Sequence, residues 1–516
     1  MESLSDLNAE RRVRRFGPPA LSHVLAGLFV ALVVVSAPLA VPATALADTS
    51  VATSTPAANT TTLYSSSPFV SSPAKKTWYR IPAIMKNAAG DLLAFAERRD
   101  NDTSNDRGNF DVVMRKSTNG GRTWGPLKVV ANDGANTVMS PSPVLEPATG
   151  DVLLITCIRT TKDVYKGIFM QRSTDGGDSF TALSESQIQP RGSWKGGLTG
   201  PGHGLVLTSG SHAGRILIAL GYRKSNYYGG YGIYSDDGGR SWATGYDQAD
   251  KSGKIGYIEG TVAELPNGEL IIGYRDKLAT TPGKTRYYAY SSDGGESLST
   301  GFTQESNLKI HSVEGSLLNA IGTHSDLLLF SSPAYTSAAD RSLRRDMAIF
   351  VSKDQGVTWA KPYYLELESK PASYSDLVQV DDGTVGILYE TGKARWRERI
   401  TFRQVRLNEL ISPTKVASSL KASLSAHAVT RTRKATVKTA VAVKGIGSPA
   451  GKVSVRFTRT TGTSGTVTVT LTYSNKGTRY VSLPKLKRGS YRISVTYSGT
   501  SRISAKTVSA GTLTVR

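Results

Sequence analysis

The sequence has little cysteine and little histidine, and these shortages exclude whole classes of site. Cys157 is the only cysteine among 516 residues, so no disulfide can form within the chain. The six histidines are scattered, without the H-E-x-x-H or C-x-x-C spacing of a zinc site, and neither a metal nor another cofactor is predicted. Stability must come from burial of a core, for which 39% apolar composition is ordinary.

Acidic residues are missing from the C-terminal fifth of the chain. Residues 411–516 contain 19 Lys and Arg and no Asp or Glu, and so account for 19 of the formal net charge of +22. Alternating segments such as KVSVRFTRT and TVTVTLTY predict a small β-sandwich. LPKLKRGSYRISVTYSG followed by TLTV resembles the closing strands of a bacterial immunoglobulin-like repeat. The charge of the sandwich favours an anionic cell-wall polymer, or membrane or nucleic acid without specificity; a solvated spacer is an equally good interpretation.

The apolar stretch near the N-terminus is short for a membrane span. Val24 to Ala37 comprises 14 residues, follows a cluster of four arginines and precedes Ala45-Leu46-Ala47. This order predicts a secretory signal peptide over residues 1–47, with an uncleaved anchor as the alternative. Secretion is therefore expected, with retention at the cell surface as a variant, and membrane contact only before cleavage. Residues 48–72, rich in Thr, Ser, Ala and Pro, are expected to form a flexible lead-in.

One short motif recurs five times between these ends. STNGGRTW, STDGGDSF, SDDGGRSW, SSDGGESL and SKDQGVTW begin at positions 117, 173, 235, 291 and 352. Successive copies start 56, 62, 56 and 61 residues apart. Repeats with a period of this size are typical of propeller blades, and the Asp and Gly of each copy suit a turn between strands. Residues 73–410 are thus predicted to form an all-β, six-bladed propeller in which one blade lacks the motif.

Arginines stand in or beside apolar strands of this region. Arg80 interrupts TWYRIPAIMK, although burying a guanidinium costs several kcal/mol unless an anion meets it. Arg99 ends LLAFAERR, Arg275 lies in ELIIGYRD and Arg344 precedes DMAIFVS. Strand ends of successive blades converge near a propeller axis, so together these arginines predict an anion-binding pocket.

At this point a family resemblance becomes specific. YRIP, Tyr79 to Pro82, resembles the Phe/Tyr-Arg-Ile-Pro motif of sialidases (neuraminidases), and the repeats resemble their Asp boxes. AFAERRDNDTSNDRGNFDVVMRKSTNGG, IEGTVAELPNGELIIGYRD and SYSDL with ILYE are similar to the segments that carry the family's catalytic residues. Residues 75–405 are therefore identified as similar to the bacterial and animal exo-α-sialidases.

The resemblance implies a role for each matched residue. Arg80, Arg275 and Arg344 would grip the carboxylate of sialic acid, and Glu390 would orient Arg80. Tyr374 would attack the anomeric carbon, because a carboxylate nucleophile would meet the substrate's own carboxylate. Glu259 would take the tyrosine proton, Asp106 would be the general acid and base, and Arg99 would touch the ring hydroxyls. Here Glu-Arg-Arg replaces the family's usual Glu-Gly-Arg, so the sequence leaves open which of the two arginines points inward.

Rival residues stand beside three of these positions. They are Arg341 and Arg345 for Arg344, Glu264 for Glu259, and Asp100 and Asp102 for Asp106. The spacing to the fifth motif copy favours Arg344, and the resemblance to the family's segments favours Glu259 and Asp106. A loop aspartate is by default a solvated turn residue.

The resulting hypothesis is a secreted exo-α-sialidase that releases terminal sialic acid from glycans, glycoproteins or glycolipids with retention of configuration. Three alternatives stay open: a trans-sialidase, including an intramolecular one, an enzyme for a deaminated sialic acid, and a non-catalytic sialic-acid-binding adhesin. The adhesin should lack one of Asp106, Glu259 and Tyr374, and all three are present.

Overall fold

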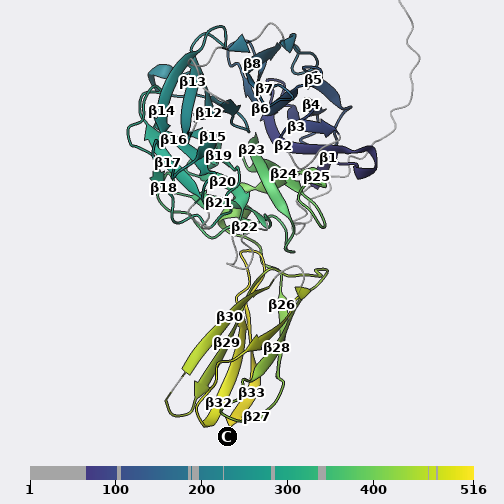
Figure 1. Cartoon of the computed structure of the whole chain (residues 1–516), viewed down its shortest axis with the longest axis vertical. Helices are drawn as coiled ribbons and strands as arrows, with labels where there is room; N and C mark the ends of the chain where they lie inside the picture. The colour runs from purple at the N-terminus through teal and green to yellow at the C-terminus, as the bar shows by residue number, and fades with distance from the viewer. Residues whose placement is uncertain are drawn as a thin grey trace, which may run out of the picture. The chain divides into compact units, whose positions relative to one another are not determined.

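The computed structural model describes residues 65–100, 106–183, 187–188, 197–224, 226–279, 285–334, 344–462, 464–471 and 475–516. The signal peptide and most of the lead-in lie outside these residues. Two all-β parts follow one another along the chain, a ring of sheets and a sandwich (Figure 1), and each is described by itself.

The ring is a six-bladed propeller in the part of the chain that the structure describes, which confirms the predicted fold class. The first two blades are β2 (Thr77–Lys86), β3 (Leu92–Asp100), β4 (Phe110–Ser117) and β5 (Lys128–Ala131), then β6 (Thr137–Leu145), β7 (Val152–Arg159), β8 (Tyr165–Ser173) and β9 (Gln187–Ile188). The third and fourth are β10 (Gly197–Thr199), β11 (Leu205–Val206), β12 (Ile216–Lys224), β13 (Tyr227–Ser235) and β14 (Ala243–Ala249), then β15 (Tyr257–Glu264), β16 (Leu270–Asp276), β17 (Arg286–Ser291) and β18 (Thr303–Gln304). The fifth is β19 (Ser316–Asn319), β20 (Leu328–Pro333), β21 (Met347–Ser352) and β22 (Tyr363–Tyr364).

The sixth blade closes the ring with a strand from the other end of the propeller. β23 (Ala372–Asp381), β24 (Thr384–Thr391) and β25 (Arg399–Arg406) are joined by β1 (Ser65–Val70), which pairs with β25. Residues 65–70 were expected in the flexible lead-in; they differ because an unpaired edge of β25 is available to them. Short helical turns η1 (Pro73–Lys75), η3 (Gly210–His212) and η4 (Gly322–His324) and helix α1 (Leu407–Ile411) complete this part.

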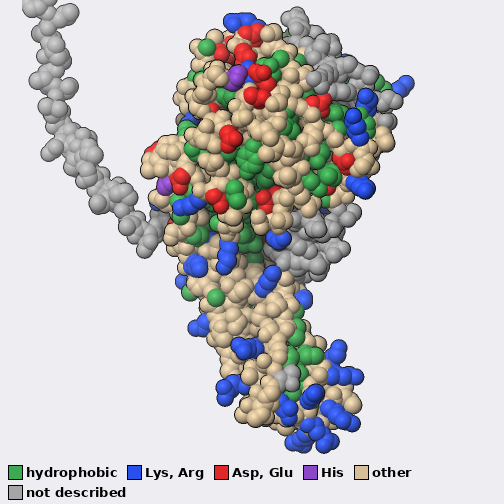
Figure 2. Space-filling view, turned by 90° about the vertical axis from the view of Figure 1, so that its left-hand side faces the viewer, with side chains coloured by type: hydrophobic (Ala, Val, Ile, Leu, Met, Phe, Trp, Pro, Cys, Tyr) green, Lys and Arg blue, Asp and Glu red, His purple; other side chains and the backbone are tan. Residues whose placement is uncertain are grey.

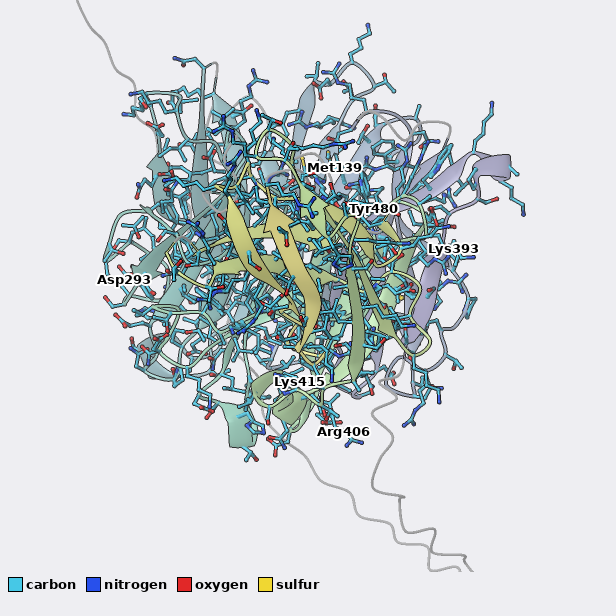
Figure 3. The ribbon with its side chains drawn as sticks, turned by 90° about the horizontal axis from the view of Figure 1, so that it is seen from below. Met139, Asp293, Lys393, Arg406, Lys415 and Tyr480 are labelled. Atoms are coloured by element: carbon cyan, nitrogen blue, oxygen red, sulfur yellow. The ribbon has the colours of Figure 1, made fainter. Side chains whose placement is uncertain are left out.

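The five motif copies have one hydrogen-bond pattern. In the first, the Ser117 hydroxyl accepts the Gly121 N–H at 2.8 Å, and the Asn119 Oδ1 accepts the Thr123 N–H at 2.9 Å. The equivalent bonds recur in the other four copies. Each copy follows the third strand of a blade, and Asp293 of the fourth lies at the periphery of the ring (Figure 3). The sixth blade has no copy because its outer strand, β1, does not follow β25 in the chain.

Apolar side chains from neighbouring blades form the propeller core, and one buried carboxylate ties several inner segments together. Asp376 of β23 accepts the N–H groups of Ile84 at 2.8 Å and His203 at 3.0 Å, and the Ser316 hydroxyl at 2.8 Å. These donors belong to the first, third and fifth blades. The inner strands are therefore fixed relative to each other close to the propeller axis.

The C-terminal part is a sandwich of two sheets, as predicted. One contains β26 (Ser418–Leu424), β28 (Thr436–Val443) and β31 (Thr478–Ser482); the other contains β27 (Ala428–Val429), β33 (Lys506–Val515), β32 (Gly489–Tyr497), β29 (Gly451–Arg459) and β30 (Ser464–Leu471). Val437, Val455 and Ile493 are among the side chains that fill the space between the sheets. Figure 2 shows Lys and Arg side chains scattered over the face of the sandwich in view, and residues 411–516 contribute no acidic side chain.

Candidate functional site

The inner strands of three blades are distorted where they approach the site. Ile81 in β2, Ser140 in β6 and Glu259 in β15 have φ values of 55°, 56° and 57°, which side chains other than glycine rarely adopt. Each strand has a bulge at that point. Pro82 explains the first, because it offers no N–H to the ladder. Distorted backbone of this kind clusters at functional sites, where it aims a side chain or an N–H group away from the ladder.

Arg80 is buried and is held by Glu390. Its Nε donates to the Glu390 Oε1 at 2.6 Å, and the same oxygen accepts the Ile81 N–H at 2.9 Å. Arg80 is 6% exposed and Glu390 is fully buried. The carboxylate of Glu390 offsets the cost of burying Arg80 and leaves the outer nitrogens of the guanidinium for another anion.

Tyr374, Glu259 and Arg275 form a hydrogen-bonded set from three different strands. The Tyr374 hydroxyl donates a short hydrogen bond to the Glu259 Oε1. Arg275 Nη1 donates to the Glu259 Oε2 at 2.6 Å and to the Tyr374 hydroxyl at 3.2 Å. A phenol bound to a carboxylate has a base in place for its proton, which is what a tyrosine nucleophile needs.

Burial and Arg275 act in opposite directions on this pair. Burial raises the pKa of Tyr374 well above its ordinary value, and the neighbouring Glu259 raises it further, so the phenol is neutral in the free protein. Burial opposes ionisation of Glu259 as well, yet its pKa lies below the usual range because Arg275 and the hydrogen bonds from Tyr374 and Arg275 outweigh it. Glu259 is therefore charged and ready to accept a proton.

Arg344 completes a group of three guanidiniums around Tyr374. Its Cζ lies 5.7 Å from the centre of the Tyr374 ring, and that of Arg80 lies at 5.5 Å. Arg344 Nη1 donates to the Ser373 hydroxyl at 3.0 Å. The rival Arg345 is buried elsewhere, with Nη2 donating to the Ser369 carbonyl at 3.4 Å, and Arg341 lies outside the described residues.

Trp396 is a site residue that the sequence did not reveal. The guanidinium carbon of Arg80 lies over its ring, 4.3 Å from the ring centre. The guanidinium carbon of Arg344 lies 5.8 Å from the same ring centre. Glu398 fixes the loop by accepting the N–H groups of residues 393, 394 and 395. The ring thus limits how Arg80 can move. The segment KARWRER has no apolar periodicity that would have indicated an inward-facing tryptophan.

Asp106 is tethered to Arg99 at the open side of the site. Arg99 Nη1 donates to the Asp106 Oδ1 at 2.9 Å, while its Nε donates to Glu97 at 2.8 Å. Arg99 is buried, but the Asp106 side chain is 76% exposed. Loss of water around the carboxylate opposes its ionisation, yet the pKa of Asp106 is lowered because Arg99 and Arg80 outweigh that effect.

These contacts show which of the two arginines in the Glu-Arg-Arg segment reaches the site. Arg99 is the one that reaches the site, where it contacts two carboxylates in the ligand-free protein. Arg98 forms ion pairs with Asp100 and Asp111, so Asp100 is engaged outside the site. Asp102 lies outside the described residues. Glu97 is a further residue that sequence reasoning missed, because an acidic side chain within a buried strand gives no sign of which arginine it faces.

Glu264, the rival of Glu259, has a structural role, as predicted. Its two oxygens accept four hydrogen bonds, from the N–H and hydroxyl groups of Thr208 and Ser209, at 2.6–3.0 Å. It therefore fixes a loop of the third blade and has no free oxygen for catalysis.

A second pair of buried ionisable residues lies next to the backbone that carries Tyr374. Glu314 Oε2 accepts the N–H of Ser375, the residue after Tyr374, at 2.9 Å, and its Oε1 has no hydrogen-bond partner. Burial raises the pKa of Glu314 well above its ordinary value. Arg286 is also buried, donates through Nη2 to the Val313 carbonyl at 2.9 Å, and leaves Nε and Nη1 without partners. Glu314 fixes the backbone that carries Tyr374.

Two kinds of feature are absent from the described residues. No cluster of His, Cys, Asp and Glu there could hold a metal ion. None of the helices among them is both long enough and apolar enough to cross a bilayer.

Comparison with known proteins agrees with this geometry. Residues 90–387 match the family model described as BNR repeat-like domain. A sialidase of Micromonospora viridifaciens is 29% identical over 343 residues, which cover 61% of this chain and 50% of that protein. The chain thus spans about half the length of this relative, and 63% of a sialidase of Bacteroides fragilis.

Solved structures give the same result for the fold. Hadza microbial sialidase Hz136 matches with a TM-score of 0.54 and 25% identity, over 64% of this chain and 66% of that one. The intramolecular trans-sialidase from Ruminococcus gnavus, solved with oseltamivir carboxylate, matches with a TM-score of 0.53 over 65% of this chain and 96% of that one. Its identity is 18%, so this second likeness concerns the fold alone.

Proposed function

This chain belongs to the BNR repeat-like family, with named sialidases among its relatives, and from that premise we propose that it is a secreted exo-α-sialidase. One observation carries the proposal: three arginines surround a tyrosine whose hydroxyl is bound to a glutamate. A substrate with a carboxylate next to its reacting carbon fits this arrangement. Sialic acid has that carboxylate on the anomeric carbon.

Binding would begin with the substrate carboxylate. Arg80, Arg275 and Arg344 offer planar N–H pairs to it, and charge-assisted hydrogen bonds of this type contribute about 1.5–3 kcal/mol each. Glu390 and Trp396 keep Arg80 in place before the substrate arrives. The anomeric carbon is thereby held next to the Tyr374 oxygen, which is the positioning that accelerates the first step.

The reaction would follow in two displacements. Tyr374 attacks the anomeric carbon and gives its proton to Glu259, while Asp106, which must first take up a proton, donates it to the departing glycosidic oxygen. Asp106 then removes a proton from water, which attacks the sialyl-tyrosine, and Glu259 returns the proton to the phenol oxygen. Two inversions give net retention.

Release of a fluorophore from an α-sialoside tests this function. Wild-type protein is expected to release it, and Tyr374→Phe, which lacks the nucleophilic oxygen, is expected to lose almost all activity. NMR of the first product then separates an α-configured hydrolysis product from transfer to another sugar or to an internal hydroxyl. Absence of turnover in the wild type, or full activity in the variant, would contradict the proposal.

The ends of the chain complete the proposal. Residues 1–47 would direct export, and the sandwich would hold the enzyme to an anionic cell-wall polymer through its lysines and arginines. The absence of acidic residues from 411–516 supports this attachment. Salt-sensitive cosedimentation of the full chain with cell walls, lost after chemical removal of the anionic polymer, is the expected result.

A further inference from the structure

The leaving-group side of the pocket is bordered by residues to which the proposed reaction gives no role. Asp106 faces the glycosidic oxygen in that reaction, so the sugar next to sialic acid must lie beyond it. Lys277 stands two residues beyond Arg275, at the end of β16, and is exposed. Its charge contributes to the lowered pKa of Asp106, which places it within electrostatic reach of that carboxylate.

Two cations from neighbouring blades meet at one tyrosine ring. Lys277 Nζ lies 5.6 Å from the centre of the Tyr228 ring, and the guanidinium carbon of Arg223 lies at the same distance. Arg223 and Tyr228 are cross-strand partners in the hairpin of β12 and β13. The half-buried ring therefore brings a lysine of the fourth blade and an arginine of the third close together.

Neither cation forms an ion pair with a carboxylate of the described residues. The acidic residue beside Lys277, Asp276, is buried and accepts the N–H groups of Gly256 and Leu278 through its Oδ1. Two cations held near each other without a directly paired carboxylate repel, and an anion placed between them would relieve that repulsion.

We propose that Arg223, Tyr228 and Lys277 form a subsite for a negatively charged sugar next to the sialic acid that is released. The charge on that sugar would be a carboxylate, as in a second sialic acid, or a sulfate. This inference rests on the proposed sialidase function, because it places the second sugar by the position of the scissile bond.

The test compares the cleavage of substrates that differ in the sugar next to the released sialic acid, and uses the same set of variants for each substrate. The substrates are sialyllactose, a sialyllactose sulfated on the sugar next to sialic acid, and an α2,8-linked disialyl-lactose. For each protein, the kcat/KM of an acidic substrate is divided by that of sialyllactose. General changes in catalysis cancel in this ratio, including any effect of Lys277 on Asp106.

In the wild type, we expect the ratio to exceed one for at least one acidic substrate and to fall as salt is added, because exposed charges are screened. In Lys277→Gln and in Arg223→Gln, it should fall about five- to tenfold, the size expected of a charge-assisted contact weakened by solvent. Lys353→Gln, an exposed lysine of the fifth motif copy, is the matched control and should keep the wild-type ratio.

The outcomes separate this inference from the function on which it rests. If no substrate is cleaved, the proposed function is wrong. If sialyllactose is cleaved but the ratio is unchanged in both variants, or is below one in the wild type for both acidic substrates, the subsite does not exist. A preference for only one acidic substrate supports the subsite and identifies the anion.

Discussion

Replacing Glu390 by glutamine separates the positioning of Arg80 from its charge. The buried carboxylate accepts N–H groups from Arg80 and Ile81, and from Tyr374 at 3.4 Å. A glutamine of the same size keeps one oxygen. Its NH2 group replaces the other oxygen and therefore faces an N–H group of the protein, with which it cannot form a hydrogen bond. Removal of one partner of a buried ion pair costs about 3–5 kcal/mol, and we expect about 3 kcal/mol because the retained oxygen can still accept the N–H groups of Arg80 and Ile81.

The same change should reduce catalysis through geometry. A displacement of about 1 Å in a group that orients the substrate can cost on the order of 100-fold in rate. We therefore expect kcat/KM for a fluorogenic α-sialoside to fall by about 100-fold in Glu390→Gln, equivalent to about 2.7 kcal/mol. Most of the loss should be in kcat, because the substrate carboxylate can still bind the freed guanidinium.

Glu264→Gln provides the matched control for this experiment. Glu264 is also buried and accepts four hydrogen bonds, but it contacts neither an arginine nor the site. Unfolding in denaturant should show both variants destabilised, with kcat/KM reduced only in Glu390→Gln. Equal kcat/KM values for the two variants would refute the idea that Glu390 positions Arg80.

Three further outcomes are expected from the site. Asp106→Asn should lower kcat/KM for sialyllactose by about 100-fold or more, but much less for an aryl sialoside whose leaving group needs little protonation; equal losses would argue against a general acid. Because the pKa of Glu259 lies below its ordinary 4.5, kcat/KM for the aryl sialoside should not decline until the pH drops below about 4.5. If kcat/KM already declines near neutral pH as the pH is lowered, Glu259 is excluded as the base. Glu314→Gln keeps an acceptor for the Ser375 N–H and should retain kcat within about threefold, whereas Glu314→Leu should lower it more than tenfold; similar values for the two variants would contradict the positioning role.

The local sequence was sufficient to predict a site residue where the environment of that residue follows from its own strand. Arg80 stands out because it interrupts an apolar run, and Tyr374 and Arg275 lie in short motifs with a recognisable order. The structure brings these residues together through bulges at positive φ. The bulges at Pro82 and Pro141 have a proline as their sequence signal, and the one at Glu259 has none. The convergence of blades on one axis was predictable from the repeats.

The remaining features depend on partners that are distant in the chain. Trp396 is a site residue only because its loop folds over Arg80, and Glu314 matters only because it meets the N–H of Ser375. Arg99 donates to Asp106, a contact that the sequence did not indicate, and its expected contact with the sugar hydroxyls stays a prediction. No periodicity or spacing encodes such contacts.

Closure of the ring by β1 also depends on a partner that is distant in the chain. The pairing of Ser66 with Phe402 joins residues from opposite ends of the propeller, and a segment rich in serine and proline gives no strand signal by itself. Only the free edge of β25 makes it a strand.

Trapping the covalent intermediate tests the central claim most directly. A 2,3-difluoro sialic acid carries a good leaving group, while its second fluorine slows both displacements, so a glycosyl-enzyme should accumulate. We predict that the intact protein gains the mass of one fluorosialyl group and that peptide fragmentation places it on Tyr374. Attachment to Glu259 or Asp106, or continued turnover of α-sialosides by Tyr374→Phe at the wild-type rate, would contradict the account.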